Sequence, residues 1–120
     1  TQEHIEQADH NRSFVDEPNF QQSAYLDWVV TGMFYEAVHW IEGYLALQNI
    51  HSSNHGQRGT TMERIPPLSG DPDLIADYGI LRIESENARY FCYKHTPSQV
   101  TDDLLPLVSR VSVTIRNLLP

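Results

Sequence analysis

The chain has 120 residues, of which 40% are apolar and 10% aromatic, and its formal net charge is −8 at pH 7. This composition excludes a disordered chain, and the length suits one domain that buries a core without disulfide bonds. The acidic charge excludes a broad basic surface for non-specific nucleic-acid binding, so any contact with nucleic acid must be local.

Residues 1–16 carry a weak helical pattern with Asp and Glu on the exposed side, and they predict a first helix. Pro18 and Asn19 end this helix, because proline lacks the N–H that a helix needs. The next helix is expected to start between Asn19 and Ser23. The inward-facing positions of the first helix are Ile5, Ala8 and either Arg12 or Val15.

The stretch Tyr25–Leu47 contains no proline and predicts a long, buried central helix. Its apolar side chains form one broad arc of Leu26, Val30, Phe34, Ala37, Val38, Ile41, Tyr44 and Leu45. Opposite the arc runs a narrow stripe of Tyr25, Gly32, Glu36, His39 and Gly43. Two glycines beside a carboxylate and an imidazole indicate either the close approach of a neighbouring backbone or a polar group held there.

A short third helix is expected from about His55 to Ile65. Asn54 can cap its N-terminus, and Pro66 and Pro67 end it.

The fourth helix has the best-marked start, with Asp71 as N-cap and Pro72 at the first helical position. Its core stripe consists of Leu74, Tyr78, Leu81, Ser85, Ala88 and Cys92. Cys92 is therefore expected to be a small buried apolar residue.

The last helix is expected to open at Thr96-Pro97-Ser98. Its stripe consists of Val100, Leu104, Val108, Val111, Ile115 and Leu118, whose helical spacing argues against a strand. Pro106 either lies in the first turn of a helix that starts late, near Asp102, or bends the helix.

Together these elements predict one all-α domain over residues 1–120, an up-and-down bundle of four main helices and one short one. Charged residues interrupt the longest apolar helix, so we expect no membrane span and a soluble, cytoplasmic protein. Cys92 is the single cysteine, and it cannot form an internal disulfide bond, which fits a reducing compartment.

Several segments together resemble small proteins of the HEPN superfamily, whose name stands for higher eukaryotes and prokaryotes nucleotide-binding. The first three are Ala8–Asn11, Asp27-Trp28 through Phe34-Tyr-Glu-Ala-Val-His39, and His55-Gly-Gln-Arg58. The fourth is Tyr78 to Leu81 followed by Ser85, Ala88, Arg89 and Tyr90. The similarity covers roughly residues 8–90.

This resemblance implies a helical bundle that dimerises and serves toxin–antitoxin, phage-defence or RNA-processing systems, without a metal or another cofactor. Active members are ribonucleases with an arginine and a histidine four to six residues apart, and Arg89 and His95 have five residues between them. Arg89 would stabilise the charge on phosphorus, and His95 would transfer the proton. Tyr90 stands where the family usually has a polar residue.

His55 and Arg58 share one face of the third helix, so they can join an anion site with Arg89. The alternative is that His55 and Arg58 lie on a solvent-exposed face of this helix, whose N-terminus Asn54 caps. For Arg89 and His95 the alternative is an ion pair of Arg89 with Glu84 or Glu86 and an exposed loop histidine.

Glu36 and His39 have the Glu-x-x-His spacing of di-metal bundles, but the chain has no second copy of that motif. We therefore expect no metal there, and expect both side chains to satisfy buried partners such as Arg58 or Arg89. Trp28 and Tyr35, outside the apolar arc, are candidate dimer contacts. The competing functions are a non-catalytic, dimerising or antitoxin-like interaction module and a metal-binding bundle enzyme.

Overall fold

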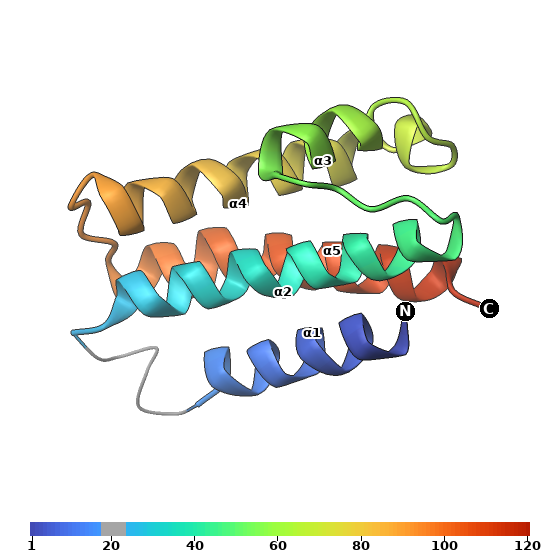
Figure 1. The fold of residues 1–120 in the computed structure, drawn as a ribbon. Coiled ribbons are helices and arrows are strands. Elements are labelled where there is room, and N and C mark those ends of the chain that lie inside the picture. Colours follow the sequence, from blue (N-terminus) through green and yellow to red (C-terminus); the bar gives the residue numbers. More distant parts are fainter. Residues whose placement is uncertain (18–23) are drawn as a thin grey trace.

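The computed structural model describes residues 1–17 and 24–120, which form helices and connecting loops without a strand (Figure 1). The elements are α1 (Gln2–Val15), α2 (Leu26–Leu47), α3 (His55–Met62), a 3-10 turn η1 (Leu68–Gly70), α4 (Pro72–Tyr90), a π-helical turn η2 (Gln99–Leu104) and α5 (Leu105–Leu118). The predicted all-α class, with four main helices and one short one, is confirmed. No helix in the described residues is both long and apolar enough to cross a membrane.

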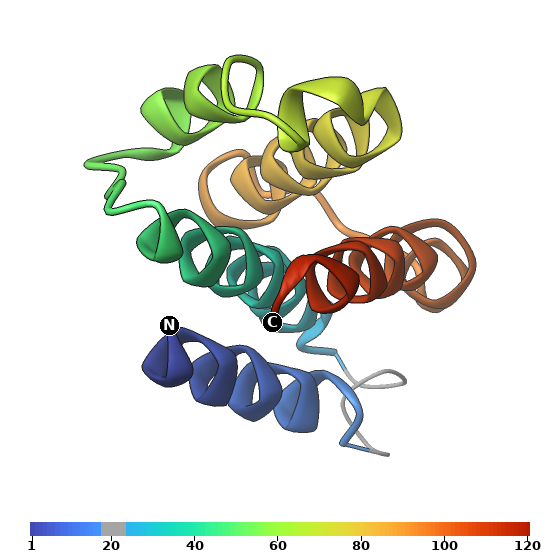
Figure 2. The same cartoon turned by 90° about the vertical axis from the view of Figure 1, so that its right-hand side faces the viewer.

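The helices α1, α2, α4 and α5 run alternately in opposite directions, and both chain termini lie at the same end of the bundle (Figure 1). Seen end-on, α2 lies between the other three and contacts each of them (Figure 2). The short α3 lies on the outside of α4. The predicted central helix is confirmed, and it begins at Leu26. Its start and the break after the first helix were expected within residues 18–23, which lie outside the described part of the chain.

The core is built around α2, and Val30, Phe34, Ala37 and Ile41 on the predicted arc are completely buried. The two glycines of the opposite stripe face α1. A Cβ added at Gly32 would lie 3.1 Å from Cδ1 of Phe14, and one added at Gly43 would lie 3.2 Å from Cβ of His4. The glycines thus let α1 pack closely on α2, which is one of the two expected alternatives.

Both predicted helix caps are present. The side chain of Asn54 accepts a hydrogen bond from the Gln57 amide at 2.8 Å, and that of Asp71 accepts one from the Leu74 amide at 3.0 Å. The helix α3 ends at Met62, before the expected Ile65. A proline disfavours helical geometry in the residue before it, and Pro66 follows Ile65 directly.

Pro106 lies in the first turn of α5, where its missing N–H costs no helical hydrogen bond. The preceding residues, Gln99–Leu104, wind as a π-helical turn instead of continuing the α-helix. The predicted stripe of this helix is buried from Val100 to Ile115, and Leu118 is half-buried.

The prediction for Cys92 is wrong, because its side chain is exposed. The helix α4 ends at Tyr90, and Cys92 adopts a left-handed conformation with φ of 55°. Such a residue commonly closes a helix C-terminus. The Tyr93 amide then donates back to the Asn87 carbonyl at 3.2 Å, so the chain turns away before the apolar stripe reaches Cys92.

Candidate functional site

Arg89, in the last turn of α4, holds its guanidinium among aromatic rings. Its Cζ lies 5.0 Å from the ring centroid of Tyr90, 5.6 Å from that of Tyr35 and 5.9 Å from that of Phe34. Nη1 donates to the Tyr35 hydroxyl at 3.1 Å, and Nε donates to the Ser85 carbonyl at 3.3 Å. A guanidinium has five N–H donors, so others remain for a ligand.

Arg89 also differs from most of the other arginines, because it forms no ion pair with a carboxylate among the described residues. Five arginines form ion pairs with carboxylates, namely Arg12 with Glu36, Arg58 with Glu42, Arg82 with Glu86, Arg110 with Asp77 and Arg116 with Asp9. Within the described residues Arg89 has no such pair, and neither does the exposed Arg64. Arg89 is thus a half-buried cation that forms no ion pair in the described part of a strongly acidic chain.

His55, at the start of α3, contacts the same rings as Arg89. Its ring centroid lies 4.9 Å from that of Phe34 and 6.0 Å from that of Tyr35. Burial first, and then the nearby arginines, lower the pKa of His55; these arginines are Arg58, Arg89 and Arg82. An imidazole in this setting is neutral at pH 7 and accepts at Nδ1 from Arg58 Nη1 over 2.7 Å.

Arg58 is buried and connects α3 to two other helices. Its Nε donates to Glu42 at 2.6 Å and its Nη1 to the Tyr78 hydroxyl at 3.3 Å. The Tyr78 hydroxyl in turn donates to the His55 carbonyl at 2.9 Å. The structure therefore brings His55, Arg58 and Arg89 into one cluster, in which Arg58 holds α3 in place.

His95 lies in a separate cluster. Its Nε2 is 2.6 Å from Oε2 of Glu84, and its ring packs edge-on against Tyr93 with the centroids 4.6 Å apart. Glu84 and Arg89 are five residues apart on α4, which places them about 140° apart around the helix axis. Among the described residues, Arg89 and His95 thus share no hydrogen-bond or ion-pair partner.

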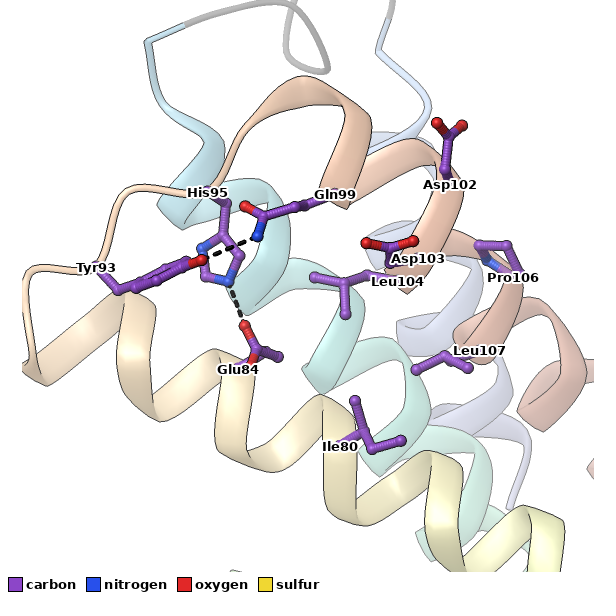
Figure 3. A pocket seen from close by; sticks show the side chains of 10 residues that line it. All are labelled: Ile80, Glu84, Tyr93, His95, Gln99, Asp102, Asp103, Leu104, Pro106 and Leu107. Atoms are coloured by element: carbon purple, nitrogen blue, oxygen red, sulfur yellow. Dashed lines mark hydrogen bonds and ion pairs between the residues drawn. The ribbon is translucent and has the colours of Figure 1, made fainter.

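The His95 cluster borders a cavity of about 510 Å³, which is lined by residues of α4, the loop after it, the π-helical turn and the first turn of α5 (Figure 3). Glu84 holds His95 from below, while Asp102 and Asp103 rim the other side. The His95 side chain is only 1% exposed, and its Nδ1 is buried with no partner in the described part of the chain. The alternative of an exposed loop histidine is therefore wrong.

The expected partners of the acidic residues also need correction. Glu84 binds His95 and Glu86 binds Arg82 at 3.1 Å, so neither pairs with Arg89.

Glu36 and His39 do not face Arg58 or Arg89, and that expectation is wrong. Glu36 accepts from Arg12 Nε at 2.6 Å, and His39 Nδ1 lies 2.9 Å from His4 Nδ1. The physical reason is that α1 covers the polar stripe of α2, whereas α3 and α4 pack on another side. In the described residues no group of three or more His, Cys, Asp or Glu side chains is placed to hold a metal ion.

Comparison with protein-family models, curated proteins and solved structures finds no match to this chain. We therefore infer function from the cluster around Arg89. The sequence indicates Tyr35 only as a candidate dimer contact. In the structure the Tyr35 hydroxyl binds the guanidinium of Arg89, and the sequence carries no signal for this role. Tyr35 and Arg89 are 54 residues apart, so no local pattern connects them.

Proposed function

We propose that this protein is a HEPN-like helical bundle that binds RNA or nucleotide at Arg89, acts as a homodimer, and serves an RNA-linked stress, defence or toxin–antitoxin process. The observation that carries the proposal is the half-buried guanidinium of Arg89, which is flanked by three rings and forms no ion pair with a carboxylate among the described residues. Partly burying an unpaired charge costs free energy, and an anionic ligand recovers that cost.

Phosphate groups fit this setting because a guanidinium binds their oxygens through two parallel N–H groups. The rings of Tyr35 and Phe34 restrict the guanidinium, so less conformational entropy is lost on binding. Aromatic rings next to a cation are also the means by which proteins bind single-stranded nucleic acid, since bases stack on rings. The site is local, as the net charge of −8 requires.

Ribonuclease activity without a metal is the enzymatic form of this proposal. It is supported by the spacing of Arg89 and His95 and by the carboxylate of Glu84, which holds the imidazole as catalytic histidines are held. Arg89 and Glu84, the carboxylate that holds His95, lie about 140° apart around the axis of α4, so joint action of Arg89 and His95 on one phosphate calls for a second copy of the chain. This requirement is why we propose a homodimer as the active form.

The binding test compares wild-type protein with Arg89→Gln by fluorescence anisotropy on a labelled single-stranded RNA of mixed sequence at low salt. A hydrogen bond to a charged group contributes about 1.5–3 kcal/mol, so Arg89→Gln is expected to weaken binding at least tenfold. Arg116→Gln is the matched control, because it removes the same charge from an arginine that lies 4.8 Å from the Trp40 ring and pairs with Asp9. Equal affinities of all three proteins would contradict the proposal.

The reaction is tested separately, by RNA cleavage in the presence of a chelator. Both Arg89→Ala and His95→Ala are expected to abolish cleavage. Cleavage that persists in both variants removes the mechanism, while the binding result stands on its own.

A non-catalytic dimerising module is favoured by a different observation, the exposure of aromatic side chains at one end of the bundle. Trp28 is 58% exposed, Tyr90 67% and Phe91 71%. Light scattering distinguishes the two functions when it is combined with the binding assay. A dimer that binds no RNA supports the interaction module, and a monomer that binds neither RNA nor nucleotide contradicts both.

A further inference from the structure

A small cavity lies beside Arg89, between the first turns of α2 and the last turn of α4. Its volume is about 260 Å³, and it is lined by Asp27, Trp28, Thr31, Ala88, Arg89 and Tyr90. Pockets for drug-sized ligands measure roughly 300–1,000 Å³, so this one suits a single planar group. The exposed ring of Trp28 offers a face on which such a group can stack, and so does the face of the exposed Tyr90 ring that the Arg89 guanidinium does not cover.

Asp27 brings an acceptor to this cavity. Its carboxylate is half-buried and makes no hydrogen bond or ion pair within the described residues. Its backbone carbonyl accepts from the Thr31 hydroxyl at 2.8 Å, so the local hydrogen bond leaves both carboxylate oxygens available. A carboxylate in the first turn of a helix is stabilised by the helix dipole.

The cavity therefore combines an acceptor-only group, a donor-only group and two stacking surfaces. Asp27, which lines the cavity, supplies two carboxylate acceptors, and Arg89 supplies N–H donors that the described residues leave unused. A ligand that fits must offer two adjacent donors on the edge of a flat ring and an anionic group beyond it.

Resting on the proposed function, we infer that this cavity binds a guanine base. The N1–H and the N2 amino group of guanine are adjacent donors that match both oxygens of Asp27, as in bidentate recognition of a carboxylate. The base stacks on Trp28 and Tyr90, and Arg89 binds the attached phosphate.

The other RNA bases do not fit this acceptor pair. Adenine and cytosine each place one amino group beside a ring nitrogen that accepts, and uracil places one N–H between two carbonyl groups. Each would therefore bring an acceptor against a carboxylate oxygen. Selection arises from this repulsion as well as from the bonds to guanine.

The test measures binding by isothermal titration, with GMP and AMP as free ligands and with two short single-stranded RNAs that differ by one central G or A. Wild-type protein is expected to prefer guanine by about tenfold, within the range of a bidentate base contact. A preference in both ligand pairs assigns the site to the base itself. A preference confined to the RNAs assigns it to guanine within a strand.

Asp27→Asn is the decisive variant, since it keeps the shape but replaces one acceptor by a donor. The preference is expected to fall to about twofold or less, while binding of the A-containing RNA changes little. Asp27→Glu, which keeps the charge but shifts the carboxylate, is expected to lose the preference too, and it serves if the first variant fails to fold. Asp102→Asn is the matched control, because it removes an exposed carboxylate that lines the other cavity.

The outcomes separate this inference from the proposed function. RNA binding that depends on Arg89 but shows no preference for guanine overturns the inference alone. No RNA binding by the wild-type protein overturns both. If Trp28→Ala converts a dimer to a monomer without changing the affinity for GMP or for the G-containing RNA, the aromatic end is an interface between copies and the inference is wrong.

Discussion

Nδ1 of His4 lies 2.9 Å from Nδ1 of His39, and this contact links α1 to the buried central helix. One of the two nitrogens must donate a hydrogen bond and the other must accept it. The accepting nitrogen carries no proton, so at least one of the two imidazole rings is neutral. Burial first, and then the charges of His4 and Arg58, lower the pKa of His39, while Glu42 raises it. The contact between α1 and α2 is therefore sensitive to pH.

The first prediction is that the protein loses stability as pH falls below 6.5, the ordinary histidine value. The pKa of His39 is lowered in the folded state, so the unfolded chain takes up a proton at a higher pH than the folded chain does. The free energy of unfolding falls in that window by up to about 1.4 kcal/mol per pH unit, and levels off once folded His39 is protonated. Urea unfolding between pH 8 and pH 5 measures this.

His39→Gln is expected to reduce that slope and to leave the part that comes from His55, whose pKa is also lowered by burial, because glutamine keeps a polar partner for His4 but does not titrate. His10→Gln changes an exposed histidine of the same helix pair and is expected to leave the slope as it is. Parallel slopes in wild type and His39→Gln would show that the pair does not carry the effect.

The second prediction concerns the ion pair of Arg12 with Glu36. The Glu36 side chain is 2% exposed and that of Arg12 28%, so Arg12→Ala leaves a buried carboxylate alone. Breaking such a pair costs about 3–5 kcal/mol, and the partial exposure of Arg12 places the expected loss at about 3 kcal/mol. Chemical denaturation measures it, with Arg116→Ala, at an exposed pair, expected to cost less than about 0.5 kcal/mol.

The third prediction uses two glycines in helices. A Cβ added at Gly79 in α4 meets nothing within 4 Å, so Gly79→Ala is expected to stabilise the protein by about 0.5–1 kcal/mol through helix propensity. Gly43→Ala is expected to gain less or to destabilise, because the new methyl meets Cβ of His4 at 3.2 Å. Thermal melting of both variants checks the order, and a larger gain at Gly43 would contradict the close packing of α1.

The fourth prediction concerns Glu84, which holds the buried His95. Glu84→Ala leaves both imidazole nitrogens without a partner, and the free energy of unfolding is expected to fall by about 1–3 kcal/mol. Asp103→Ala, an exposed carboxylate on the same cavity, is expected to change it by less than about 0.5 kcal/mol. Urea unfolding of the two variants at pH 7 decides the matter, and equal stabilities would show that the Glu84 contact contributes nothing.

The helices and their caps could be predicted because their signals are local. Asp71 and Pro72 mark the start of α4, and Asn54 marks that of α3, through contacts with residues three positions away. The prediction for Cys92 is wrong because the end of α4 depends on the left-handed conformation of Cys92, which the spacing of residues in the sequence does not show.

Sequence alone determined the helical class, the central position of α2 and the identity of its polar stripe, because helical periodicity repeats within a few residues. Tertiary structure alone decided the partners of that stripe. Glu36 binds Arg12 across 24 residues and Arg89 binds Tyr35 across 54, and several arginines were equally available in the sequence. Which charge meets which depends on the side of α2 that each helix covers, and this is set by packing of the whole core rather than by any local spacing.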